Sequence, residues 1–161
     1  MEKSLVNVNN EITVNLSIEL VWHAWTISDR AAQWFAPDTN IGSKVGGPYE
    51  LYFVPGNKSG MNTKGCKILK LDHCKELVFE WKGPDQFNSL MNKAYPLTKV
   101  TVNFEKVRDD TTKVIVLHTG FKEGDAWNEA IQWHEMAWSG VLKSLKSALE
   151  TGEGELCCQP E

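Results

Sequence analysis

The stretch AIQWHEMAWSGVLKSLKSAL, residues 130–149, predicts a long amphipathic helix near the end of the chain. Side chains that recur at about 100° per residue form one broad apolar stripe, made of Trp127, Ala130, Ile131, Ala137, Trp138, Val141, Leu142, Leu145, Ala148 and Leu149. His134 lies at the centre of this stripe, where an ionisable imidazole is unexpected. Asp125 is a suitable N-cap, and a helix from there to Glu150 is long enough, at about 1.5 Å per residue, to cross a whole sheet.

The chain before this helix has mostly the period of β-strands. Apolar side chains alternate along residues 6–16, and short segments rich in Val, Ile, Tyr, Phe and Thr follow, separated by turn residues. These segments are residues 40–45, 48–54, 64–72, 76–82, 97–107 and 112–119. Two short helices, 17–27 and 28–36, are expected directly after the first strand. The pattern predicts an α+β fold in which a curved antiparallel sheet of about seven strands wraps around the C-terminal helix.

The composition excludes several classes of protein. The 161 residues carry a net charge of −4 and their lysines are scattered among acids, so no surface for nucleic acid is expected. No apolar run approaches the roughly 18 residues of a membrane span, the N-terminal residues lack signal-peptide character, and the cysteines show no pairing pattern. We therefore expect a cytoplasmic protein without membrane insertion. Its single domain would span residues 1–150, and 151–161 would form a flexible tail in which Cys157 and Cys158 are free thiols.

Four segments taken together resemble one protein family. They are KVGGPYEL at 44–51, ELVFEW at 76–81, TKVIVLHTGF at 112–121 and HEMAWSGVLKSL at 134–145. Their order resembles the SRPBCC superfamily, also called START-like or helix-grip, and within it the group called activator of heat-shock-protein-90 ATPase homologue-like. The resemblance implies a helix-grip fold with a hydrophobic tunnel between the sheet and the long helix. It also implies binding of lipids or other small apolar molecules in that tunnel.

The residues expected to line this tunnel come from inward positions of the strands and of the final helix. They are Tyr49, Leu51, Phe53, Phe79, Trp81, His118, Trp127, His134 and Trp138. His118 has the strand parity of Val114 and Val116, so both imidazoles can face one cavity and orient a ligand. The alternative is that each is a core histidine, bonded to a neighbouring backbone carbonyl or tyrosine hydroxyl.

No metal site, cofactor or catalytic residue is expected. Besides His118 and His134, only Cys66 or a carboxylate such as Glu135 could supply a further metal ligand, and Glu135 lies off the apolar stripe. His23 and His73 are assigned to solvated positions, the first on the polar side of a short helix and the second in a turn.

Three functions remain open from the sequence. We favour a non-enzymatic domain that binds a small hydrophobic ligand. The first alternative is a co-chaperone-like regulator of a heat-shock-protein-90 ATPase, active in the stress response through surface contacts that include the long connection at 83–96. The second is a cyclase-like or dehydratase-like enzyme in which His118 and His134 transfer protons. Both a monomer and a homodimer are compatible with the pattern.

Overall fold

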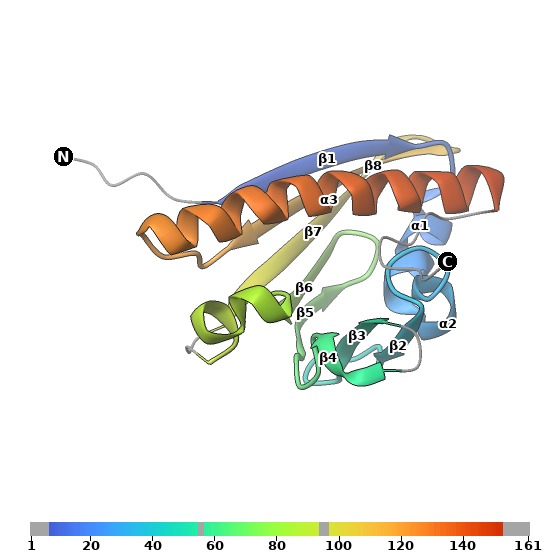
Figure 1. Cartoon of the computed structure of the whole chain (residues 1–161). Coiled ribbons are helices and arrows are strands. Elements are labelled where there is room, and N and C mark those ends of the chain that lie inside the picture. Colours follow the sequence, from blue (N-terminus) through green and yellow to red (C-terminus); the bar gives the residue numbers. More distant parts are fainter. Residues whose placement is uncertain (1–6, 55–56, 94–96, 153–161) are drawn as a thin grey trace.

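The structure is a computed structural model that describes residues 7–54, 57–93 and 97–152, with the side chains of 57–61 left aside (Figure 1). Its strands, in chain order, are β1 (Val8–Val14), β2 (Asp38–Ile41), β3 (Tyr49–Val54), β4 (Asn57–Asn62), β5 (Ile68–Asp72), β6 (Glu76–Trp81), β7 (Thr98–Arg108) and β8 (Thr111–Thr119). Its α-helices are α1 (Ile18–Thr26), α2 (Ser28–Ala31) and α3 (Asp125–Thr151). Cys157, Cys158 and Tyr95 lie outside the described residues.

The strands form a five-stranded sheet in the order β1-β8-β7-β6-β5 and a three-stranded sheet in the order β2-β3-β4. All pairs are antiparallel, and the register places His118 of β8 opposite Val8 on one side and Val100 on the other. A bridge between Pro48 and Lys67 joins the two sheets, supported by a bond of 2.9 Å from Tyr49 N to Cys66 O. The strands therefore continue from one sheet into the other around the core.

Helix α3 is the element that the sheet surrounds. Figure 1 shows it running beside β1 and β8, while β7, β6 and β5 diverge from it. Its buried side chains are Ala130, Ile131, His134, Trp138, Leu142, Ser144 and Leu145, which recur at helical spacing. Because this stripe packs on the sheet, tertiary burial holds the helix from Ala130 to Leu145. It ends at Gly152, whose φ of 88° suits a left-handed C-cap.

Aromatic packing fills the end of the core next to α1 and α2. Trp25 and Trp34 meet edge to face with ring centroids 4.7 Å apart, and Trp34 stacks on Phe35 at 4.6 Å. Phe35 in turn contacts Trp138 of α3 at 5.7 Å. The indole N–H of Trp34 donates to the Ala24 carbonyl at 2.9 Å. This cluster joins the short helices to α3 and closes one end of the molecule.

The α+β helix-grip fold predicted from the sequence is confirmed. Two local differences stand out. A strand, β4 (Asn57–Asn62), lies between the predicted strands 48–54 and 64–72, where no strand was predicted. The connection at 83–96 contains a 3₁₀ turn at Asp85–Phe87 and a π-helical turn at Asn88–Asn92.

None of the helices in the described ranges combines the length and the apolar character that crossing a membrane requires. Cys66 and Cys74 are both free thiols.

An apolar pocket beside His134

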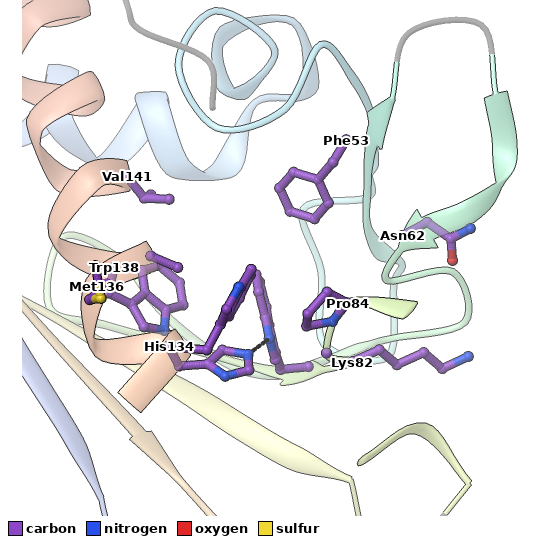
Figure 2. A pocket seen from close by; sticks show the side chains of 12 residues that line it. Phe53, Asn62, Lys82, Pro84, His134, Met136, Trp138 and Val141 are labelled. Carbon is purple, nitrogen blue, oxygen red and sulfur yellow. Dashed lines mark hydrogen bonds between the residues drawn. The ribbon is translucent and has the colours of Figure 1, made fainter. Parts of the chain in front are cut away.

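A pocket of about 370 Å³ lies beside the middle of α3. Figure 2 shows Met136, Trp138 and Val141 on the α3 side, with Phe53 and Asn62 opposite them. The complete lining is Phe53, Asn62, Trp81, Lys82, Gly83, Pro84, Trp133, His134, Met136, Ala137, Trp138 and Val141. Most of these side chains are apolar, and the polar groups among them are few, which is the usual make-up of a small-molecule site.

Helical periodicity explains how α3 forms one wall of the pocket. His134, Ala137, Trp138 and Val141 are three or four residues apart and therefore share one face of the helix. Met136 lies at the edge of this face and is 78% exposed, so it belongs to the rim. The opposite wall comes from the end of β6 and the residues that follow it.

His134 is fully buried and both of its ring nitrogens have partners. Its Nε2 accepts a bond of 3.1 Å from the indole Nε1–H of Trp81, and its Nδ1 donates to the Ala130 carbonyl at 2.7 Å. These partners require a neutral ring with its proton on Nδ1. Burial lowers the pKa of His134 to about 4, against a smaller opposite effect of the Ala130 bond. The ring is therefore neutral at pH 7.

His118 has a second, parallel set of partners. Its Nδ1 accepts a bond of 3.1 Å from the indole Nε1–H of Trp138, and its Nε2 lies 2.9 Å from Thr98 Oγ1. The proton is therefore on Nε2, which donates to the hydroxyl. Burial lowers the pKa of His118 well below its ordinary value, and the neighbouring His134 lowers it further.

The structure brings the two imidazoles together, with ring centroids 5.0 Å apart and planes at 88°. Each ring is saturated with hydrogen bonds, and both use an indole N–H as donor. General acid–base chemistry needs a ring nitrogen within reach of substrate, and here every such nitrogen is already engaged. Both imidazoles are therefore neutral, and their ring nitrogens are bonded to the Trp81 and Trp138 indoles, the Thr98 hydroxyl and the Ala130 carbonyl.

The residues expected to line a tunnel fall into two groups. Phe53, Trp81, His134 and Trp138 line the pocket. The pocket lining does not include Tyr49, Leu51, Phe79, His118 or Trp127. Tyr49, Leu51, Phe79 and His118 are completely buried in the core, where the Tyr49 ring stacks on Phe79 at 4.0 Å and its hydroxyl donates to the Trp25 carbonyl at 2.7 Å. Trp127 packs on Phe121.

The sequence pattern did not indicate the part of the lining that follows β6. Gly83 and Pro84 enter the pocket because the chain turns there into the short helical segment at 85–92. A Cβ on Gly83 would lie 2.5 Å from Met91 Sδ, so any larger residue would require the Met91 side chain to move. The Gly-Pro pair was a visible turn signal, but its place in space depends on long-range packing.

None of the metal ligands considered from the sequence converges on the two histidines. Among the residues that the structure describes, one group of three potential ligands comes together, and it consists of Glu19, His73 and Cys74. None of these residues lines the pocket.

Comparison with known proteins identifies the family. The family model described as Activator of Hsp90 ATPase homolog 1-like protein matches residues 15–150. The solution structure of the Aha1 dimer from Colwellia psychrerythraea is similar, with 26% identity, a TM-score of 0.72, and coverage of 93% of this chain and 100% of that one.

More distant structures show the same fold. A protein from Mesorhizobium loti has 18% identity and a TM-score of 0.70, covering 89% of this chain and 96% of its own. An HSP90 activator from Plasmodium falciparum has 18% identity and a TM-score of 0.56, with coverage of 90% and 88%. No curated protein matches this chain. With the family model extending from the end of β1 to the last turn of α3, the chain belongs to the Activator of Hsp90 ATPase homolog 1-like family.

Proposed function

We propose that this protein is a non-enzymatic binding domain for a small, mostly apolar molecule. The observation that carries the proposal is the pocket of about 370 Å³ next to α3, with indoles from Trp81, Trp133 and Trp138 in its wall. Its volume falls within the range of about 300–1,000 Å³ in which proteins hold small ligands. The saturated hydrogen bonding of His134 favours a guest that is recognised by shape and apolar contact.

The wall also indicates which guests fit. Aromatic faces and the side chains of Ala137 and Val141 offer dispersion and hydrophobic contact, and Asn62 and Lys82 at the other side offer polar groups. A ligand that buries about 200 Å² of apolar surface gains about 5 kcal/mol from desolvation, before the costs of association. We therefore expect flat aromatic metabolites or short acyl chains that carry one polar end.

The test is thermal unfolding in the presence of a panel of fatty acids and aromatic metabolites. A ligand that binds only the native state raises the apparent melting temperature, and the stabilisation grows with the logarithm of one plus the ratio of the ligand concentration to Kd. Ala137→Phe places a ring in the pocket and should abolish this increase. Ala126→Phe makes the same change at an exposed position in the first turn of α3 and should leave the increase intact.

Two outcomes would contradict ligand binding. The first is a panel in which no compound shifts the unfolding of the unmodified protein. The second is a shift that is equal in Ala137→Phe and Ala126→Phe, because binding would then take place away from the pocket.

A second candidate function is regulation of a heat-shock-protein-90 ATPase through the protein surface. It is supported by the family and by the similarity to the Aha1 dimer from Colwellia psychrerythraea. Adding the purified protein to the ATPase of this chaperone should then increase the rate of ATP hydrolysis. If Ala137→Phe stimulates as well as the unmodified chain, the surface is responsible and the pocket is not required. An unchanged ATPase rate would reject this function.

A further inference from the structure

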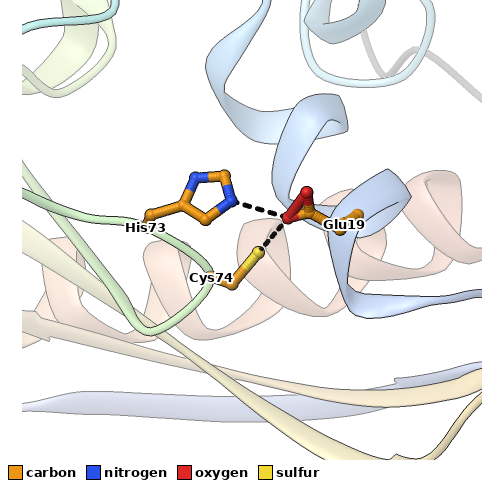
Figure 3. A group of neighbouring side chains, drawn as sticks. All are labelled: Glu19, His73 and Cys74. Carbon is orange, nitrogen blue, oxygen red and sulfur yellow. Dashed lines mark hydrogen bonds and ion pairs between the residues drawn. The ribbon is translucent and has the colours of Figure 1, made fainter.

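A cluster of three side chains joins α1 to the turn between β5 and β6. Figure 3 shows the carboxylate of Glu19 between the His73 ring and the Cys74 thiol. Glu19 Oε2 lies 2.6 Å from His73 Nε2 and 2.7 Å from Cys74 Sγ. The ligand atoms of the three residues all lie within 4.8 Å of one another. They are brought together only by folding, because Glu19 precedes His73 by 54 residues.

The cluster is not arranged for nucleophilic catalysis. An activated cysteine needs a base or a cation beside its sulfur, whereas Cys74 faces the carboxylate of Glu19. Burial, together with this hydrogen bond, raises the pKa of the Cys74 thiol to about 12. The thiol is therefore protonated at neutral pH, which is not the state of a nucleophilic cysteine.

The donor set is the one that zinc prefers. A thiolate, an imidazole nitrogen and a carboxylate oxygen are its common protein ligands, and a tetrahedral site leaves one position for water. Ligand atoms around tetrahedral zinc lie about 3.3–3.8 Å apart. Glu19 Oε2 would have to withdraw by about 1 Å from both neighbours to admit the ion. Its side chain is 54% exposed, so the carboxylate can move, and that of His73 is 65% exposed, so the ion can reach both groups.

Surrounding contacts hold two of the ligands in place. The buried ring of Trp22 meets the His73 ring edge to face, with centroids 5.6 Å apart, and restricts its orientation. Cys74 has a φ of 58°, the one positive φ among the non-glycine residues that the structure describes. This left-handed turn is closed by a bond of 2.9 Å from Lys75 N to Asp72 O, and it points the sulfur toward α1.

We propose that Glu19, His73 and Cys74 form a zinc site that clamps α1 to the β5–β6 turn. The three side chains supply the oxygen, nitrogen and sulfur ligands, and water takes the fourth position. The bound ion replaces the direct contacts of the carboxylate with His73 and Cys74, and the thiol proton passes to solvent when the sulfur coordinates. The site is separate from the apolar pocket and does not depend on the proposed ligand-binding function.

Cobalt serves as the spectroscopic probe, since it occupies zinc sites and its thiolate complexes absorb in the near ultraviolet. The full chain carries Cys157→Ser and Cys158→Ser, so that these vicinal thiols do not bind metal. Titration with Co²⁺ should give a thiolate-to-cobalt band and tetrahedral visible bands at one ion per chain. Added Zn²⁺ should remove both, and Zn²⁺ should raise the melting temperature compared with a chelator-treated sample.

Single substitutions assign the ligands. Cys74→Ser should abolish the thiolate band, and His73→Gln and Glu19→Gln should each weaken binding by at least about tenfold. Cys66→Ser and Glu76→Gln, the same changes at a buried thiol and at a carboxylate paired with Lys70, should leave binding intact. Circular dichroism confirms that each variant is folded. Absence of a thiolate band in the unmodified cluster, or a band that survives Cys74→Ser, would overturn the proposal.

Discussion

At the scale of single residues, the two buried histidines determine how the core responds to acid. Burial holds the pKa of His134 at about 4, against its ordinary value of 6.5, and also lowers the pKa of His118. At pH values between the folded and unfolded pKa of each histidine, the unfolded chain therefore binds protons that the folded chain does not bind. Stability is fully present above about pH 6.5 and is lost as the pH falls from there toward 4.

The first prediction is a loss of unfolding free energy between about pH 7.5 and about pH 5, of about 2 kcal/mol from His134 alone. Urea denaturation followed by tryptophan fluorescence measures it. Glu19, Glu50 and Glu150 have lowered pKa values, but their ordinary value is 4.5, so their contribution is lost below this window.

The control for this prediction is His134→Gln. Glutamine keeps an acceptor for the Trp81 indole and a donor for the Ala130 carbonyl, but it does not titrate. The loss between the two pH values should be smaller in this variant by about 2 kcal/mol. Equal losses in the two proteins would show that His134 is not protonated on unfolding.

At the scale of the elements, two glycines have opposite roles. Gly120 connects β8 to α3 with a φ of 97°, and a Cβ there would lie 3.2 Å from the backbone Cα of Thr98. Gly140 lies in the exposed interior of α3, where a Cβ would have no heavy atom within 4 Å. The backbone at position 120 requires glycine, whereas the glycine at position 140 only lowers the helix propensity of α3.

We predict opposite signs for the same substitution at these sites. Gly120→Ala should destabilise the protein by about 1–3 kcal/mol, because alanine resists a left-handed backbone and meets Thr98. Gly140→Ala should stabilise it by about 0.5–1 kcal/mol. Chemical denaturation of both variants measures the difference. If Gly140→Ala lowers the stability instead, the added methyl group must collide with another part of the protein on this face of α3.

The elements also show which parts of the fold were predictable. Helix α3 was predictable because its apolar stripe and its length are local properties, but its N-cap is Gly124 and not the predicted Asp125. Strand β4 was not, because NKSGMN lacks the β-branched and aromatic residues that mark a strand, and it pairs with β3 through a register shift. Its structure depends on the neighbouring strand more than on its own composition.

The residues of the site also divide into those that the sequence could predict and those that it could not. Helical spacing located His134 and Trp138 on one face of α3, and strand alternation located Trp81. Parity in β3 and β6 also identified Tyr49 and Phe79 as inward-facing, but it could not say that their rings stack and fill the core. The Glu19–His73–Cys74 cluster had no sequence signal beyond an adjacent His-Cys pair, since Glu19 precedes His73 by 54 residues.

At the scale of the whole molecule, the two sheets differ in how firmly they are held. β7 has neighbours on both sides and faces α3 across the core, whereas β2 is an edge strand of a sheet joined to the rest at the Pro48–Lys67 bridge. Local opening should therefore cost less free energy in β2–β4 than in β7 and β8.

Native-state hydrogen exchange tests this prediction. Amides of β7 and β8 should exchange only through global unfolding, and those of β2 should exchange through a sub-global opening with a lower free energy. As the urea concentration rises, the opening free energies of the two groups of amides should converge on one value. If amides of both sheets exchange with one common free energy from the start, the two sheets unfold as a single unit.

The position of α3 at the end of the described chain has a consequence for biosynthesis. Residues between 133 and 141 form one wall of the pocket, so a nascent chain that lacks this segment has no complete pocket. The proposed ligand could therefore enter the pocket only after residues 133–141 have been translated and have folded against the sheet.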